Sequence, residues 1–334
     1  MGRSYQLGID IGTTSTKAVL FDAYGSAHSR HTVPYPLHTP EPGAAEQAPD
    51  QIAQAVVTAI AQTLAQGAVT PRDRLGLTLS SAMHSLLAVD AAGQPLSPVY
   101  TWADQRAQPQ ATQYQPRAPH LYARTGVPLQ PLSPLAKLLW LRATQPDLWQ
   151  QAARFVSIKE YVLYRLCGEW AVDWAIAAAS GQLNLTTLDW EPDALALAGL
   201  TPARLSPLRP PQQVLTLLPA WARTWPLAAG VPVVLGASDG VLSNLGLGVE
   251  PGRAIAISLG TSGAARATVT QPYVATDLGL FCYPLRRDYW VLGGATNSGG
   301  LAWRWLRDHW FCLPADTGDE ILDQWAATVP PGAE

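Results

Sequence analysis

The segment Asp10-Ile-Gly-Thr-Thr-Ser-Thr-Lys17 combines the residue types that bind phosphate. Gly12 lets the backbone approach a ligand closely, and the N–H groups of a tight turn form an anion-binding concavity. Hydroxyl donors and a positive charge would come from Thr13, Thr14, Ser15 and Lys17. Asp10 can hold Mg²⁺ directly or through water. No Walker A pattern is present, and the alternative is an ordinary hydroxyl-rich hairpin turn.

A similar segment follows about 250 residues later, at Ala256-Ile-Ser-Leu-Gly-Thr-Ser-Gly263. Both segments have a strand-like run, then Gly-Thr with Ser close behind, then another strand. Gly260, Thr261 and Ser262 alone are compatible with a simple turn. As a duplicated element they predict two loops that face each other across a cleft and hold a polyphosphate from both sides.

An acid stands between glycines in Gly236-Ala-Ser-Asp-Gly240, directly after a buried strand-like run. Ligands of open α/β sheets bind at such strand ends. Phosphoryl transfer to a hydroxyl needs a base that orients the hydroxyl and accepts its proton, and Asp239 fits that role. The alternative is an aspartate that caps a helix.

Two further segments offer contacts for a polyol. In Ser80-Ser-Ala-Met-His-Ser85, His84 can hydrogen-bond to hydroxyl groups and Met83 can pack on a carbon chain. Trp102-Ala-Asp-Gln-Arg106 adds an aromatic face, the carboxylate of Asp104 and the guanidinium of Arg106, which suits a substrate carboxylate. The alternatives are a structural histidine and a solvated loop with one buried tryptophan.

Alternating strands and helices must position these side chains, which predicts an α/β fold. Hairpins are expected at Leu7–Asp22 and Arg253–Val269, and buried strands at Leu75–Ser80 and Gly230–Gly236. Helical spacing predicts a helix over Gln51–Leu64 with Asp50 as its N-cap. Further helices are expected at Ser133–Ala143, Asp147–Gly168, Asp239–Leu247 and Gly299–Trp310.

The composition of the chain limits the classes of function that it can have. The 334 residues suggest two domains, 48% are hydrophobic, and a net charge of −3 gives no basic surface for nucleic acid. No apolar run is long enough for a membrane span, and the N-terminal residues do not resemble a signal peptide, so a cytoplasmic location is expected. The three cysteines, Cys167, Cys282 and Cys312, form no disulfide framework.

Together these segments resemble the FGGY family of carbohydrate kinases, of the actin-like ATPase (ribonuclease H-like) superfamily, and within it the gluconate kinases. Asp10–Ser15 and Leu259–Gly263 resemble the two phosphate motifs, and Gly236–Gly240 the segment with the catalytic aspartate. Trp102–Arg106 resembles the family's W-x-D-x-R segment, and Asp173, Ala179–Gly181 and Trp190 its D…AS-x-G…W stretch. The resemblance implies ATP and Mg²⁺ as cofactors. It implies a sugar-binding first domain, residues 1–248, and a partial second domain, residues 249–334, that lacks the adenosine-binding part.

The resulting hypothesis is phosphoryl transfer from Mg·ATP to the terminal hydroxyl of a sugar acid, most simply gluconate. Alternatives are another FGGY kinase such as a xylulose kinase, a truncated remnant that binds sugar without turnover, and an actin-like or chaperone-like ATPase. A partial second domain should leave apolar surface exposed on the second hairpin and on the Trp303–Trp310 helix. Such surface favours association, a homodimer being one form of it.

Overall fold

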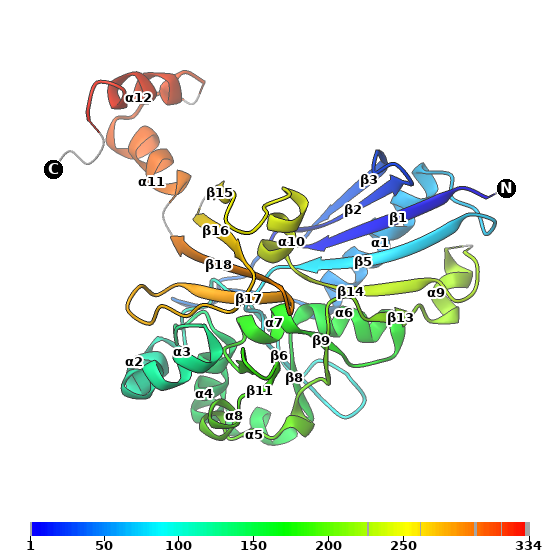
Figure 1. Ribbon diagram of the computed structural model, residues 1–334, viewed down its shortest axis with the longest axis horizontal. Coiled ribbons are helices and arrows are strands. Elements are labelled where there is room, and N and C mark those ends of the chain that lie inside the picture. Colours follow the sequence, from blue (N-terminus) through cyan, green and yellow to red (C-terminus); the bar gives the residue numbers. More distant parts are fainter. Residues whose placement is uncertain (1, 226, 261, 297–298, 315, 331–334) are drawn as a thin grey trace.

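The computed structural model describes residues 2–225, 227–260, 262–296, 299–314 and 316–330, apart from the side chains of residues 118 and 301. Its largest sheet, on the right of Figure 1, has the strand order β13-β14-β5-β1-β2-β3. The strands are β1 Ser4–Ile11, β2 Ser15–Asp22, β3 Ala27–Pro34, β5 Arg74–Ser81, β13 Val214–Thr216 and β14 Pro232–Ser238. β1, β5 and β14 run parallel, while β2 lies antiparallel to β1 and β3, and β13 lies antiparallel to β14.

One face of this sheet carries the main core. Alternate residues of β1, among them Leu7 and Ile9, are buried with Val56 and Ile60 of helix α1 (Pro49–Gln66) and Leu163 of helix α6 (Ile158–Cys167). A spacing of two residues in the strand and four in the helix puts these side chains on facing surfaces. The predicted hairpin Leu7–Asp22 is confirmed as β1–β2, and the other face of β1 is left to carry Asp10.

Helix α1 confirms the helix predicted at Gln51–Leu64, but its predicted cap is wrong. Ala48 occupies the N-cap position and Pro49 the first turn, where a missing N–H costs nothing. Asp50 lies one residue further inside the helix, and its carboxylate accepts a hydrogen bond from the hydroxyl of Tyr161. The acid therefore joins α1 to α6.

The continuous helical stretch predicted at Asp147–Gly168 is also wrong. Helix α5 (Pro146–Gln151) ends early, strand β8 (Arg154–Val156) follows, and then α6 begins. β8 pairs with β6 (Leu87–Val89), so tertiary pairing of a short, largely buried strand overrides the helical spacing. Ser157 then starts α6 with a capping box.

A helical lobe with its own core lies at the lower left of Figure 1. It contains α2 (Gln108–Tyr114), α3 (Ala118–Thr125), α4 (Pro134–Thr144), α5 and α8 (Pro192–Ala198). α4 confirms the helix predicted from Ser133, whose hydroxyl caps it. The shorter elements are β4 Glu46–Gln47, β7 Val99–Tyr100, β9 Val172–Asp173, α7 Trp174–Ala179, β10 Leu183–Asn184, β11 Asp189–Trp190, β12 Leu208–Arg209 and α9 Pro219–Thr224, with 3-10 turns at Gln115–Arg117 and Pro202–Arg204.

A second, antiparallel sheet has the order β15-β16-β18-β17 and confirms the second predicted hairpin. Its strands are β15 Ile255–Leu259, β16 Gly263–Val269, β17 Phe281–Arg286 and β18 Tyr289–Thr296. β17 packs on α7, and helix α10 (Asp239–Gly246) shares their core. The domain boundary predicted after residue 248 falls between α10 and β15.

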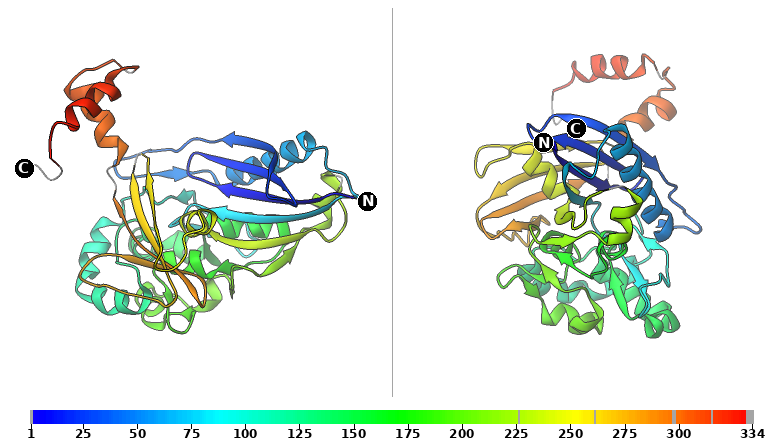
Figure 2. Two further views of the ribbon diagram at one scale, coloured as in Figure 1. Left: turned by 45° about the horizontal axis from the view of Figure 1, so that its top comes forward. Right: turned by 90° about the vertical axis from the view of Figure 1, so that its right-hand side faces the viewer.

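The last elements extend away from both sheets in Figures 1 and 2. They are α11 (Gly300–Trp305), a π-helical turn (Leu306–Trp310) and α12 (Gly318–Ala326). The predicted exposure of apolar surface is confirmed at Ile257, Leu259 and Trp310, which are 68%, 78% and 66% exposed. Within the described ranges, no helix has the length and apolar character needed to cross a membrane.

Candidate functional site

A cavity of about 380 Å³ lies between the ends of β1 and β5 and the second sheet. Seven of the residues that line it have side chains that could contact a ligand or accept a proton. They are Thr13, Met83, His84, Trp102, Asp239, Ser262 and Arg266. The structure thus brings both glycine–hydroxyl turns, the expected base and part of the expected sugar contacts to one space.

The turn of the first hairpin is fixed by side chains from three other segments. The Gly12 carbonyl accepts a hydrogen bond from Tyr35 (2.7 Å), and the Thr13 carbonyl accepts one from Gln47 (2.7 Å). Trp102 Nε1 donates to Thr13 Oγ1 at 2.8 Å. Among described residues, the backbone N–H groups of Thr13 and Thr14 have no acceptor. The turn therefore presents free donors while its carbonyls are occupied elsewhere, as an anion site requires.

Asp10 and Lys17 are opposite each other in the β1–β2 pairing, so their side chains share the sheet face away from α1. Asp10 Oδ1 accepts a hydrogen bond from Ser80 Oγ at 3.0 Å, which orients the carboxylate from the neighbouring strand β5. Lys17 is exposed. Ser15 begins β2, and Thr14 lies exposed at the tip of the turn.

Asp239 is the first residue of α10, and its side chain is reached from the cavity. It is not the N-cap, which is Ser238. Protein atoms crowd the carboxylate on its other sides, and the lost hydration raises the pKa of Asp239 to about 6. The charge of Asp10 raises this pKa further, while the Gly240 N–H (2.6 Å) and Arg266 oppose the rise. A carboxylate with this pKa is a stronger base than an ordinary aspartate and is still mostly ionised at neutral pH.

Glycine at position 236 lets β14 deliver Asp239 to the cavity. The strand pairing shifts register between Val234 and Ala237, and Gly236 has φ = +66°. A Cβ atom there would lie 1.9 Å from the Leu79 carbonyl oxygen of the neighbouring strand. Only glycine fits this close approach, so the irregularity that aims the strand end depends on it.

His84 presents a neutral ring to the cavity. Burial lowers the pKa of His84 to about 3, and Lys137 lowers it further. Nδ1 lies 2.9 Å from the Ala179 carbonyl oxygen, so a neutral ring must donate there and keep Nε2 as an acceptor. His84 also has φ = +64°, an uncommon conformation that its neighbours must hold.

Lys137 lies behind the segment that carries His84 and stabilises it. Its ammonium group is fully buried and donates to the carbonyl oxygens of His84 (2.7 Å), Thr101 (2.7 Å) and Leu132 (2.8 Å). These carbonyls belong to three segments that line the cavity. A compact ammonium with three donors can satisfy converging carbonyls, whereas the planar guanidinium of arginine cannot. Lys137 therefore fixes the cavity wall without reaching the cavity.

A second buried lysine supports Asp239. Lys159 and Asp173 are each 1% exposed and are joined at 2.7 Å. Lys159 also donates to the carbonyl of Ala237, two residues before Asp239, at 3.1 Å. The other carboxylate oxygen of Asp173 caps α7 through the N–H groups of Ala175 and Ile176. One ion pair thus links α6, α7 and the end of β14.

Asp104 and Arg106 do not line the cavity, in contrast to the sequence-based expectation. Asp104 is fully buried and accepts hydrogen bonds from the Ala45 N–H and from Arg106. Arg106 also pairs with Glu41 and Glu46, and its guanidinium lies over the rings of Tyr100 and Trp140. Glu41 and Glu46 belong to a segment that is distant in sequence, and their carboxylates are already paired with the Arg106 guanidinium. The Asp104–Arg106 pair stabilises the loop that places Trp102 at the cavity.

The second turn is built more simply. The Gly260 N–H donates to the Ser262 carbonyl at 2.9 Å, and the Gly300 N–H donates to the Gly260 carbonyl at 2.6 Å. Ser262 lines the cavity, whereas Thr261 lies outside the described residues. Arg266 was not among the predicted site residues. The sequence offers only a weak signal for it, strand alternation, which puts residues 262, 264 and 266 on one face of the extended chain.

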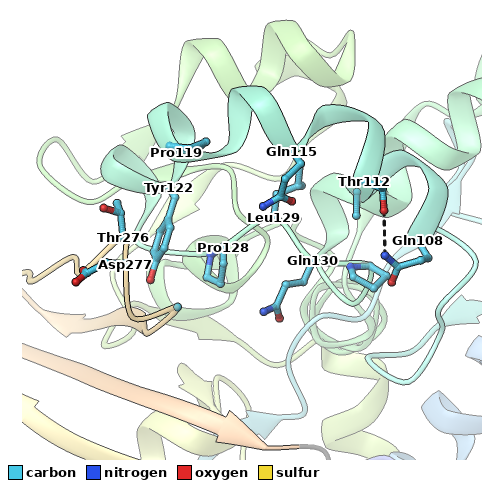
Figure 3. A pocket seen from close by; sticks show the side chains of 13 residues that line it. Gln108, Thr112, Gln115, Pro119, Tyr122, Pro128, Leu129, Gln130, Thr276 and Asp277 are labelled. Atoms are coloured by element: carbon cyan, nitrogen blue, oxygen red, sulfur yellow. Dashed lines mark hydrogen bonds between the residues drawn. The ribbon is translucent and has the colours of Figure 1, made fainter.

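A second cavity of about 430 Å³ adjoins the first and is shown in Figure 3. It lies between α2, α3 and the loops around residues 128–131 and 276–279. Figure 3 shows the amides of Gln108, Gln115 and Gln130 around it, with Asp277 at its edge. Pro128, Gln130 and Gly279 line both cavities, so the two adjoin along these residues.

Comparison with known proteins agrees with this geometry. The chain is 39% identical over 342 residues to the gluconokinase of Bacillus subtilis, covering 99% of this chain and 66% of that protein. It is 30% identical over 258 residues to the xylulose kinase of Escherichia coli, covering 77% of this chain and 53% of that protein. The chain therefore spans about two thirds of the length of the gluconokinase that it resembles.

The fold is shared with a solved structure, the gluconate kinase from Lactobacillus acidophilus. The TM-score is 0.92 at 33% identity, over 99% of this chain and 67% of that one. This confirms the predicted actin-like ATPase fold. Residues 5–246 match the sequence profile described as FGGY family of carbohydrate kinases, N-terminal domain. With 242 of its 334 residues inside that match, the chain belongs to the FGGY family of carbohydrate kinases.

Proposed function

We propose that this chain carries the sugar- and phosphate-binding site of an ATP-dependent kinase that phosphorylates the terminal hydroxyl of gluconate. The observation that carries the proposal is the position of Asp239. It faces a cavity whose wall also includes Thr13 of the first glycine–hydroxyl turn and Ser262 of the second. Similarity to proteins named gluconokinase and gluconate kinase supports a sugar acid as the acceptor.

Asp239 is the proposed catalytic base. It orients the terminal hydroxyl of the sugar and accepts its proton as the hydroxyl oxygen bonds to the γ-phosphorus and the bond to the ADP oxygen breaks. A pKa raised to about 6 matches proton acceptance near neutral pH. The rest of the acceleration comes from holding donor and acceptor in line.

The two turns are the proposed phosphate grip. Free N–H groups at Thr13 and Thr14, with the Lys17 ammonium nearby, would hold phosphate oxygens from the first hairpin. Gly12 and Gly260 would let the phosphate approach each turn closely, since their own N–H groups donate within the turns. Further contacts would come from the hydroxyls of Ser15, Thr261 and Ser262. This assignment predicts that phosphate affinity depends on both hairpins.

Asp10 is the proposed Mg²⁺ ligand. In the described part of the chain, no three His, Cys, Asp or Glu side chains lie close enough to form a complete metal site. Mg²⁺ usually keeps several waters and uses one or two carboxylates plus substrate phosphates, so Asp10 with ATP fits its preferences. Asp10 also lies near enough to Asp239 for their charges to interact, so a cation would relieve that repulsion. When bound, the ion would neutralise charge on the phosphate oxygens.

The sugar would lie against Met83, His84 and Trp102. Nε2 of neutral His84 accepts a hydrogen bond from a sugar hydroxyl, while Met83 packs on the carbon chain. In this proposal Asp104 and Arg106 support Trp102 instead of touching the substrate. The domains are residues 1–248 and 249–334, with the cavity between them. Because ATP and sugar phosphates are cytoplasmic metabolites, we propose a cytoplasmic location.

The test is sugar-dependent release of ADP. The purified chain is incubated with Mg·ATP and, separately, gluconate, xylulose, ribulose, glycerol and fucose, beside an Asp239→Asn variant whose thermal unfolding is checked. Gluconate should give the fastest release, and the variant should lose it while still binding gluconate. Release that is independent of sugar, or saturable sugar binding without turnover, would refute the proposed reaction.

A further inference from the structure

Positive charge is scarce at the cavity, and one side chain supplies it. Among the lining residues that the structure describes, Arg266 is the only one that carries a positive charge, because burial keeps the His84 ring neutral. Lys137 lies behind three carbonyls, and Arg106 is occupied by three carboxylates. In the described walls of this cavity, an anionic sugar would therefore meet one available cation, while Lys17 lies outside them near the first turn.

The guanidinium of Arg266 has spare donors. Nη1 donates to Ser258 Oγ at 3.1 Å. Nε is buried without an acceptor, and Nη2 also has none within the described ranges. A charged donor held away from water without a partner is costly, so a ligand that supplies an acceptor is stabilised there.

Arg266 also lies beside the first turn of α10. A Cβ atom at Gly240 would lie 3.0 Å from Arg266 Nε and 3.2 Å from Met83 Cε. The guanidinium is thus near the side chain proposed to pack on the sugar, and a six-carbon acid whose terminal hydroxyl meets Asp239 would curve around Met83 to bring its carboxylate to Arg266. The absence of a side chain at Gly240 leaves the room for this approach.

Charge balance decides which substrates are compatible with this arrangement. Asp239 lines the cavity and Asp10 lies near enough to Asp239 for their charges to interact, so a sugar carboxylate in the cavity is repelled unless a cation pairs with it. We infer that Arg266 binds the carboxylate of the sugar acid and so makes the site prefer sugar acids to neutral polyols. This inference rests on the proposed function. It assigns to Arg266 the role that the sequence suggested for Arg106.

The test compares two ligands that differ at one carbon. D-gluconate has a carboxylate where D-glucitol has a CH₂OH group. Calorimetric titrations measure both affinities for the wild-type chain, Arg266→Met, Arg266→Lys and the control Arg253→Met. Arg253 is an exposed arginine between α10 and β15 that pairs with Glu250 at the surface.

The wild-type chain should bind gluconate more tightly than glucitol. Arg266→Met should weaken gluconate binding by about 10- to 100-fold, the loss of a charge-assisted contact, and change glucitol binding by less than about threefold. Arg266→Lys should retain part of the preference, and Arg253→Met all of it. Unfolding midpoints identify any variant that fails to fold, in which case the lysine variant decides.

Equal losses for the two ligands, or no wild-type preference for gluconate, would overturn the inference. Equal losses would instead place Arg266 at a hydroxyl group that both ligands share. Because the affinities are measured without turnover, they decide the role of Arg266 even where the wild-type chain releases no ADP. That last result would refute the proposed reaction alone.

Discussion

The two hairpins have closely similar turn sequences but very different surroundings. In β1–β2, Leu7 and Ile9 are each 1% exposed beneath α1, and the turn is bound by Tyr35, Gln47 and Trp102. In β15–β16, the outer strand exposes Ile255 (64%) and Ile257 (68%), and the turn is bonded to itself and to Gly300. The local sequence specifies a hairpin in both places.

The difference shows that a short motif determines the conformation of a turn, whereas contacts with distant segments determine how firmly the turn is held in place. The first hairpin lies inside a six-stranded sheet and is held by side chains from distant segments. In the second, β15 is the edge strand of its sheet, and edge strands with apolar faces are prone to further association. We expect the first hairpin to be the rigid half of the phosphate grip and the second to be the adjustable half.

The largest expected effect comes from the buried ion pair that supports Asp239, which lies between the two hairpins at the cavity. Lys159→Met would leave the buried Asp173 carboxylate unpaired and release the Ala237 carbonyl. Loss of one partner of a buried pair should lower the free energy of unfolding by about 3–5 kcal/mol, measured by urea denaturation. The control Arg165→Met removes a half-exposed ion pair from the same helix and should cost about 1 kcal/mol or less. Similar costs for the two variants would contradict the assigned role.

A matched pair of substitutions compares the hairpins directly. Ile9 is buried in β1 and Ile257 is exposed in β15, each near the end of the strand that precedes its turn. Ile9→Ala should lower the free energy of unfolding by about 2–5 kcal/mol. Ile257→Ala should change it by less than about 0.5 kcal/mol. Comparable losses at both positions would show that β15 is covered in solution, and sedimentation would then identify self-association.

A smaller effect is expected at the first turn itself. Tyr35→Phe removes the donor to the Gly12 carbonyl and a contact with Thr16, which should cost about 1–2 kcal/mol in urea denaturation. The same variant should bind ADP more weakly, since the turn is then less firmly held. Tyr24→Phe is the control, because that ring is 94% exposed. Unchanged stability and ADP affinity in Tyr35→Phe would contradict the expectation that the first hairpin is the rigid half of the phosphate grip.

Features set by short sequence segments could be predicted. Both hairpins, the strand end that carries Asp239 and the α/β class follow from local patterns, and the structure confirms those elements. The helix expected across residues 147–168 failed because β8 pairs with β6, a contact that spacing cannot reveal. The placement of Arg106 failed for a similar reason, since Glu41 and Glu46 are distant in sequence.

Arg266 illustrates the opposite case. Its distance of four residues from Ser262 predicts that both lie on the same strand face. That position suggests no function for the arginine until the residues on the opposite wall of the cavity are known. That wall is built by Met83, His84 and Asp239, which arrive from other parts of the chain. The cavity, and the scarcity of cations in it, are properties of the assembled fold.

The most direct test of the central claim is the pH dependence of gluconate-dependent ADP release. Because the protein atoms around its carboxylate raise the pKa of Asp239 to about 6 although the side chain is open to the cavity, and the ionised form is the base, kcat/KM of the wild-type chain should fall below about pH 6, by about tenfold per pH unit. Asp239→Asn should be slower by about 10²- to 10⁴-fold and lack this acidic limb. A wild-type profile that stays flat through pH 6, or an Asp239→Asn variant with the wild-type rate, would contradict the account.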